Sequence, residues 1–228
     1  MSDVPASIRK VVDLCSDIAF VRNEVPESES RSERLYRLRH STAHVMAEAV
    51  VQLFPSAQVA TGPSIEHGFY YDFDLPRPLT PDDLEAIARR MKKLIKRNHN
   101  FSTATVPMAR ARQLFAEAGQ TYKLEVIDGI AEKQGVDEVT LYKQSEFVDL
   151  CAGPHVGGTK ACRQFQLLKV AGAYWRGDSD RPMLQRIYGT AWESKEDLDA
   201  YLFFLEEARK RNHKRIGAEL DLFHFNKV

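Results

Sequence analysis

A long helix-forming stretch from about Ser32 to Phe54 constrains the fold of this chain more than any other feature. Side chains that share one face recur at spacings of three and four residues, which is the period of an amphipathic helix. Pro55 follows the stretch and cannot continue a helix, so we expect the helix to end there. The face consists of Tyr36, His40, Ala43, Ala47, Val51 and Phe54, with His44 on or beside it. The stretch therefore predicts one long helix that presents two histidines, four residues apart, from the same side.

The other segments mix helices and strands without regular alternation. Thr80 suits an N-cap and Pro81 the first helical position, so a second helix is expected there, with one apolar and one basic face. Further helices are expected at 107–119 and from Glu193 to about Arg215, the latter basic at its end. Strands are expected within 59–76, 101–108, 122–128, 138–153, 164–176 and 183–192. This pattern predicts an α+β fold, a largely antiparallel sheet packed with helices, followed by a C-terminal helical linker.

Composition narrows the functional classes. The 228 residues carry 32 basic and 32 acidic side chains, so a nucleic-acid partner would have to meet a local basic patch. No apolar run approaches the roughly 18 residues that a membrane span needs, and the N-terminus lacks the features of a signal peptide. The three cysteines suit a reducing, cytoplasmic location.

Four side chains form a candidate site. His40 and His44 come from the long helix, and Cys151 and His155 flank the turn Ala152-Gly153-Pro154. Two imidazoles from a helix and a thiolate and an imidazole from a turn are typical of tetrahedral zinc. The same groups could instead hold a water molecule and transfer protons, because imidazole titrates near neutrality. Spacing alone leaves both interpretations open, together with the possibility that the two pairs are unrelated.

Four longer stretches resemble a known family. They are "HSTAHVMAEAV", "GPSIEHGFYYDF", "FVDLCAGPHV" and "VAGAYWRGDSDRPMLQRIYGTAW". Together they resemble the N-terminal editing region of threonyl-tRNA synthetases, to which a domain of alanyl-tRNA synthetases is related. The likeness runs from about residue 33 to the end, where "KRIGAELDLFHF" resembles the join to the aminoacylation core. It implies an N-terminal extension or linker at 1–31, an editing domain at 32–191, and a linker helix with the start of the core at 192–228.

The resemblance implies hydrolysis of the ester in mischarged seryl-tRNA(Thr), a proofreading reaction. It places His40, His44, Cys151 and His155 in the hydrolytic pocket and adds Lys123 and Asp149. We expect His40, or a water that it orients, to act as the general base, and Lys123 to stabilise the oxyanion or contact the ribose phosphate. Asp149 is expected to hold the substrate ammonium, while a buried structural carboxylate and a solvated strand lysine are the plain alternatives for Asp149 and Lys123.

The expected partners are the acceptor end of tRNA(Thr) and the aminoacylation core of the same polypeptide, with neither DNA nor a membrane involved. Tyr174, Trp175, Arg176 and Arg186 are candidates for tRNA contacts, although Trp175 is equally suited to core packing. The basic faces of the second and last helices are further candidates, or simply solvated surfaces. The alternatives are a non-catalytic tRNA-binding appendage, a free-standing trans-editing protein and a structural zinc module. No cofactor is expected to be required: zinc is possible at the four-residue site, and ATP is expected only in the core, which the chain lacks.

Overall fold

The computed structural model describes residues 11–211, which form an α+β fold with two antiparallel sheets. The fold class predicted from the sequence is confirmed. The helices are α2 (Arg31–Leu53), α3 (Pro81–Arg97), α4 (Met108–Glu117), α5 (Thr121–Gln134) and α6 (Lys195–Lys210), with 3₁₀ turns η1 (Thr159–Arg163) and η2 (Trp175–Gly177). Within residues 11–211, no helix combines the length and the apolar character needed to cross a membrane.

The larger sheet has the strand order β2-β4-β9-β8, with β3 paired to β4. Its strands are β2 (Gln58–Val59), β3 (Ser64–Ile65), β4 (Gly68–Asp74), β8 (Phe165–Tyr174) and β9 (Met183–Ala191). The smaller sheet has the order β1-β5-β6-β7. It is built from β1 (Val21–Arg22), β5 (Phe101–Pro107), β6 (Glu138–Gln144) and β7 (Phe147–Leu150). The expected hairpin around 59–76 and the late strand pair are both present.

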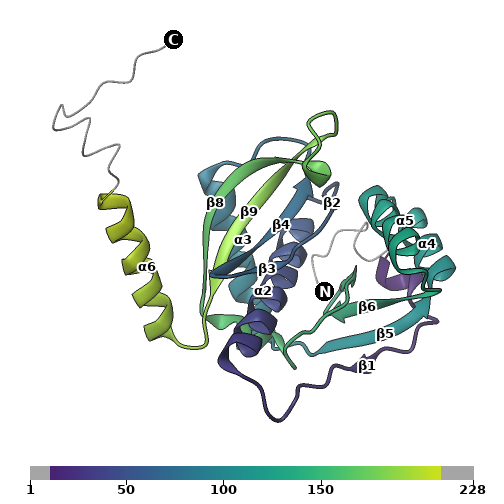
Figure 1. Cartoon of the computed structure of the whole chain (residues 1–228), viewed down its shortest axis with the longest axis horizontal. Coiled ribbons are helices and arrows are strands. Elements are labelled where there is room, and N and C mark those ends of the chain that lie inside the picture. Colours follow the sequence, from purple (N-terminus) through teal and green to yellow (C-terminus); the bar gives the residue numbers. More distant parts are fainter. Residues whose placement is uncertain (1–10, 212–228) are drawn as a thin grey trace.

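Helix α2 joins the two sheets into one body. Helices α2 and α3 lie against the larger sheet, α4 and α5 lie beside the smaller sheet, and α6 extends away at the other end (Figure 1). Residues 37–52 of α2 are all buried, because the helix has the larger sheet on one side and the ends of β5–β7 on the other. Polar side chains on a helix buried on all sides normally have hydrogen-bond partners, so the surroundings of the two histidines matter.

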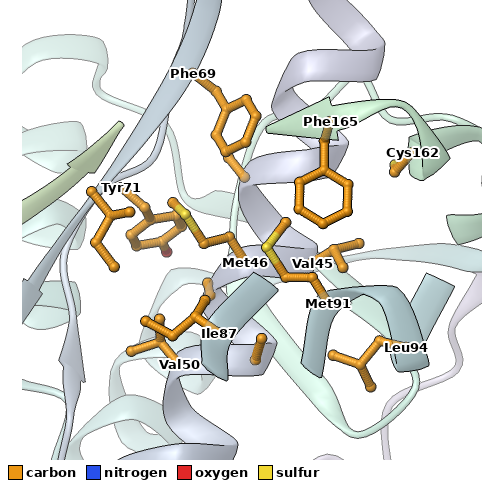
Figure 2. Packing of buried hydrophobic residues seen from close by; sticks show 14 of the residues in the cluster. Val45, Met46, Val50, Phe69, Tyr71, Ile87, Met91, Leu94, Cys162 and Phe165 are labelled. Carbon is orange, nitrogen blue, oxygen red and sulfur yellow. The ribbon is translucent and has the colours of Figure 1, made fainter. Parts of the chain in front are cut away.

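The main apolar core lies between α2, α3 and the larger sheet. Figure 2 shows Met46 of α2 and Met91 of α3 in the middle of this core, with Tyr71 of β4 and Phe165 of β8 around them. Both methionines are fully buried. A second cluster packs α4 and α5 on the smaller sheet and includes Cys15 from the N-terminal segment. Each sheet therefore has its own core, and α2 runs along the boundary.

Local signals place the helix ends. Ser30 and Glu33 form a capping box at the start of α2, and Thr80 and Asp83 form another at the start of α3. Helix α2 ends at Leu53, just before Pro55, as predicted. Helix α6 begins at Lys195 after its N-cap Ser194. The expected basic end of that helix at residues 214–215, and the stretch resembling the join to the core, lie outside the described residues.

One expectation about local structure needs revision. The segment 122–128 was predicted to be a strand but lies within α5, so the prediction was wrong. The alternation of Tyr122, Leu124 and Val126 has the period of a strand. The segment is nevertheless helical, and the helix buries Tyr122, Lys123 and Ile127. In the N-terminal segment, residues 11–14 are helical, and residues 1–10 lie outside the described part.

Candidate active site

Helix α2 places His40 and His44 one turn apart on the same side. Their ring centroids are 5.3 Å apart, and the rings meet edge to face. His44 is nearly sealed from solvent, whereas His40 keeps 9% of its surface exposed and lies beside the half-exposed ring of Tyr36. The accessible side of this pair is therefore the side of His40.

Cys151 and His155 lie on the loop that follows β7. Gly153 in this loop has φ +71°, and a Cβ atom at this position would lie 2.4 Å from the hydroxyl of Tyr142. The position therefore requires glycine both for its left-handed backbone and for its close approach to the tyrosine. The loop brings the His155 ring into a stack with Phe101, at 4.9 Å between centroids and 3° between planes. His155 is completely buried.

The four predicted groups meet at one point. Their donor atoms, one per residue, all lie within 4.8 Å of one another. The Sγ atom of Cys151 lies 3.3 Å from Nε2 of His40 and 3.2 Å from Nε2 of His155. The backbone N–H of Gly153 also donates to this sulfur. The helix pair and the loop pair thus form one cluster, which we call the His–Cys cluster (His40, His44, Cys151 and His155).

Ser41 fixes the tautomer of His155. The Ser41 hydroxyl donates to the carbonyl of Arg37 at 2.8 Å and accepts from the N–H of Val156 at 2.9 Å. The single hydroxyl proton of Ser41 goes to the Arg37 carbonyl. The serine oxygen must therefore accept at its 3.1 Å contact with Nδ1 of His155. His155 therefore carries its proton on Nδ1 and presents an unprotonated Nε2 to Cys151.

A second polar group adjoins the cluster and is formed by Lys123, Asp149 and Tyr71. The Nζ atom of Lys123 lies 2.6 Å from Oδ1 of Asp149, and it donates to the Ala60 carbonyl at 2.7 Å and to the Tyr71 oxygen at 3.1 Å. Tyr71 donates to Oδ2 of Asp149 at 2.5 Å, and the same oxygen lies 3.8 Å from Nε2 of His44. Lys123 is thus a buried helix residue, so the alternative of a solvated strand lysine is wrong.

Burial sets the charge states of the cluster. Desolvation lowers the pKa of His44 to about 3 and lowers the pKa values of His40 and His155 as well. Desolvation also raises the pKa of the Cys151 thiol to about 12. At neutral pH the cluster therefore holds three neutral imidazoles and a thiol, which is a poor nucleophile but a proton donor to its neighbours.

Asp149 stays ionised for a different reason. Burial alone would raise the pKa of its carboxyl, but the Lys123 ammonium, His44 and the Tyr71 hydroxyl together lower it below the ordinary value. The negative charge beside the cluster is thus neutralised by Lys123. Tyr71 was missed by the sequence analysis, although it lies in the aromatic alternation of 69–73 with its side chain on the core face of β4.

The donor set fits a zinc ion in type and nearly in geometry. Bonds of about 2.0–2.3 Å in a tetrahedral site place donor atoms roughly 3.3–3.8 Å apart. The two sulfur–nitrogen distances, 3.3 and 3.2 Å, lie at and just below the lower end of this range, and the widest separation in the cluster lies above it, so small rotations would suffice. His40, His44, Cys151 and His155 would then hold the metal, and Ser41 would orient His155 from behind.

The predicted tRNA-contact residues on η2 and β9 mostly face protein partners. Trp175 is buried, and its indole N–H donates to Glu125 at 2.9 Å. Arg176 donates to the backbone of Glu125, and Arg186 makes a double hydrogen bond to Asp72. Tyr174 is substantially exposed. Arg176 is also largely exposed despite this bond, so Tyr174 and Arg176 are the two side chains of the set that a nucleotide could most readily reach.

A basic depression lies next to the loop that carries His155. It has a volume of about 450 Å³ and lies between the end of α3 and η1. Its lining residues are Lys92, Ile95, Lys96, Asn98, Lys160, Arg163 and Phe165. No carboxylate lines it, and none of its four cations forms an ion pair with another residue in the range 11–211. A neutral chain therefore presents a concentrated positive surface here.

Comparison with known proteins assigns the region. Residues 139–188 match the family described as the threonyl and alanyl tRNA synthetase second additional domain. Threonine–tRNA ligases match most of the chain: that of Solidesulfovibrio magneticus is 58% identical over 189 residues, 83% of this chain and 29% of the relative. The ligase of Polynucleobacter necessarius is 51% identical over 215 residues, 94% of this chain and 32% of the relative.

The chain resembles the N-terminal editing region of threonyl-tRNA synthetases. It spans about a third of the length of these relatives; the ligase of an Azoarcus species, for example, is 52% identical over 215 residues, which is 33% of that protein. The family match covers β6 to β9 and thus includes Cys151 and His155. The other half of the His–Cys cluster, on α2, precedes the matched range, so the cluster combines residues from inside and outside that range.

Proposed function

We propose that this chain is the editing module of a threonine–tRNA ligase and hydrolyses the ester of seryl-tRNA(Thr). Serine lacks one methyl group of threonine, and one methyl group provides only about 1–3 kcal/mol of discrimination. A synthetic site that binds the hydroxyl therefore needs a second, hydrolytic site to reach high accuracy. The proposal depends mainly on one observation: the His–Cys cluster with its open side at His40, within a sequence similar to threonine–tRNA ligases. As such a module, it would act in the cytoplasm.

In the proposed reaction, water attacks the ester carbonyl and His40 accepts its proton. A lowered pKa keeps the His40 imidazole neutral and able to accept a proton at neutral pH. The carbon–oxygen bond to the terminal ribose then breaks, and the proton passes to the ribose oxygen. The products are serine and uncharged tRNA. Attack by Cys151 is disfavoured because its raised pKa keeps the thiol protonated.

The other residues are assigned supporting roles. His44, Cys151 and His155 shape the pocket and bind the seryl amine and hydroxyl, and Asp149 attracts the substrate ammonium. Lys123 has three protein acceptors, so it can stabilise the oxyanion only by exchanging one of them for substrate. Until then it neutralises Asp149. The proposed reaction requires no metal, and a zinc ion bound by the cluster would supply Lewis-acid chemistry at the same place.

The acceptor end of tRNA(Thr) is the proposed partner, alongside the aminoacylation core of the same polypeptide. The basic depression provides cations for the phosphates of the acceptor stem, close to the loop that carries His155. Tyr174 provides an exposed aromatic ring for an unpaired base. Trp175 and Arg176 are proposed to support it, after release from Glu125.

The test compares two substrates on the same chain. Seryl-tRNA(Thr) should be hydrolysed much faster than threonyl-tRNA(Thr) prepared in the same way. Binding of both without hydrolysis of either would reject the proposal in favour of a non-catalytic tRNA-binding appendage.

A further inference from the structure

The segment 21–30, which belongs to the N-terminal extension or linker expected at 1–31, reaches the site. Strand β1 pairs with β5, with Val21 opposite Thr103 and Arg22 opposite Ser102. The next residue, Asn23, continues this pairing, because its N–H donates to the Phe101 carbonyl at 2.9 Å. Asn23 is 8% exposed, although its neighbours on both sides are exposed. A single buried polar residue in an exposed segment has a specific partner to satisfy.

That partner is the backbone of His155. The side-chain N–H of Asn23 donates to the His155 carbonyl, and its side-chain oxygen accepts from the Tyr142 hydroxyl at 3.3 Å. The Tyr142 ring packs on the His155 ring with 4.4 Å between centroids. One amide therefore holds His155 twice, directly through its carbonyl and indirectly through the tyrosine that packs against its ring.

Arg37 supplies a second donor to the same carbonyl. Its Nη1 atom lies 3.3 Å from the His155 oxygen, and its Nη2 atom pairs with Glu29. The side chains of Arg37 and Glu29 are only 5% and 9% exposed. A buried guanidinium is costly without a carboxylate, so Glu29 is required for Arg37 to remain at this position. Both lone pairs of the His155 carbonyl are thereby used.

We infer that Asn23 and the Glu29–Arg37 pair are positioning residues of the editing site. They fix the His155 backbone from one side while Ser41 holds its Nδ1 atom from the other, so that Nε2 points at Cys151. The effect expected on catalysis rests on the proposed function. The placement of the His155 ring follows from the contacts alone. A misplacement of about 1 Å within an active site costs up to roughly a hundredfold in rate, even when its cause lies away from the reacting atoms.

Asn23→Ala is the direct test, and Arg110→Ala is its matched control. Arg110 tethers the same N-terminal segment through Asp17 and the Leu14 carbonyl, away from His155. On the full chain, Asn23→Ala should lower kcat for seryl-tRNA(Thr) hydrolysis about tenfold or more with KM within about twofold. Arg110→Ala should leave both constants unchanged. Glu29→Gln, a milder change because the side chain keeps its size and an oxygen that can still accept from Arg37, should give a smaller loss of kcat of the same kind.

Nitrogen NMR of histidine-labelled protein separates this inference from the proposed function. His155 should show a single tautomer protonated at Nδ1 in the wild type and in Arg110→Ala. In Asn23→Ala its ring nitrogen signals should shift or broaden. This readout needs no catalysis, so it tests the positioning even if seryl-tRNA(Thr) is not a substrate. A folded Asn23→Ala protein with wild-type His155 signals would overturn the inference, as would one with undiminished kcat.

Discussion

Lys123 of α5 and Asp149 of β7 form an ion pair of 2.6 Å, and each residue is only 2% exposed. The pair connects α5, on the smaller core, to the strand that leads into the His–Cys cluster. Breaking a buried pair by removing one partner costs about 3–5 kcal/mol, because it leaves an uncompensated charge. The pair therefore couples the stability of the fold to the geometry of the site.

Lys123→Met should lower the free energy of unfolding by about 3–5 kcal/mol, because the Asp149 carboxylate then lacks its cation. The double variant Lys123→Met/Asp149→Asn should recover part of the loss, since neither charge remains. Urea unfolding of the two single variants and the double variant measures the coupling. Strictly additive losses would contradict the pairing.

Stability should fall as pH rises from about 4.5 to about 8 because of Glu48. This fully buried carboxyl of α2 has its pKa raised from 4.5 to about 8, first by desolvation and further by the nearby Glu146, against the lowering effects of Ser145 and Arg97. A folded-state pKa above the unfolded value means that stability is greatest below about pH 4.5 for this group and is lost as pH rises through about 8. Across this range we expect a loss of a few kcal/mol, and none from this group at higher pH, where the carboxyl is ionised in both states. Glu48→Gln should flatten this part of the profile; an unchanged slope would disprove the assignment.

Much of the fold follows from local sequence signals. Helix α2 has a 3.6-residue period, a capping box at Ser30 and a proline after its end, and all three point to the same element. Local signals also identified α3, which begins after its N-cap Thr80, and the strand pair β8–β9. The prediction of a strand around Lys123 was wrong because the buried face of α5 includes Lys123 itself. Its partner Asp149 lies 26 positions away in the sequence. Periodicity cannot reveal a buried charge whose counter-charge is remote.

Local spacing also made part of the candidate site predictable. His40 and His44 belong together through helical spacing, and Cys151 and His155 through a short turn. That the two pairs meet at one point was predicted from the type of their donor groups and from the family resemblance. Tyr71, Ser41 and Asn23 carry no such signal, since each acts through hydrogen bonds to residues that are distant in the sequence.

Charge reversal in the basic depression should weaken RNA binding. Lys92→Glu/Lys96→Glu should lower affinity for a tRNA(Thr) acceptor minihelix and reduce the slope of log affinity against log salt by about one per lost phosphate contact. Lys133→Glu/Arg112→Glu makes the same change in net charge on α4 and α5 and serves as the control. Equal effects of the two double variants would indicate general electrostatics and not a defined surface.

Removal of metal should leave hydrolysis intact. Protein stripped with a chelator should deacylate seryl-tRNA(Thr) at the rate of untreated protein, because His40 can activate water as a neutral base. Zinc titrated into the stripped protein should bind the His–Cys cluster, and Cys151→Ala should weaken that binding. Loss of activity on stripping, restored by zinc, would show that the reaction depends on the metal.

Single-turnover deacylation of seryl-tRNA(Thr) by the wild type and by His40→Ala tests the central claim most directly. Removal of a general base typically costs about 10²–10⁴ in rate, so the variant should be slower by that factor while it binds the tRNA equally well and remains folded. His67→Ala, at an exposed histidine of the β3–β4 turn, is the control and should react as the wild type does. A folded His40→Ala protein that hydrolyses seryl-tRNA(Thr) at the wild-type rate would contradict the assignment of this site.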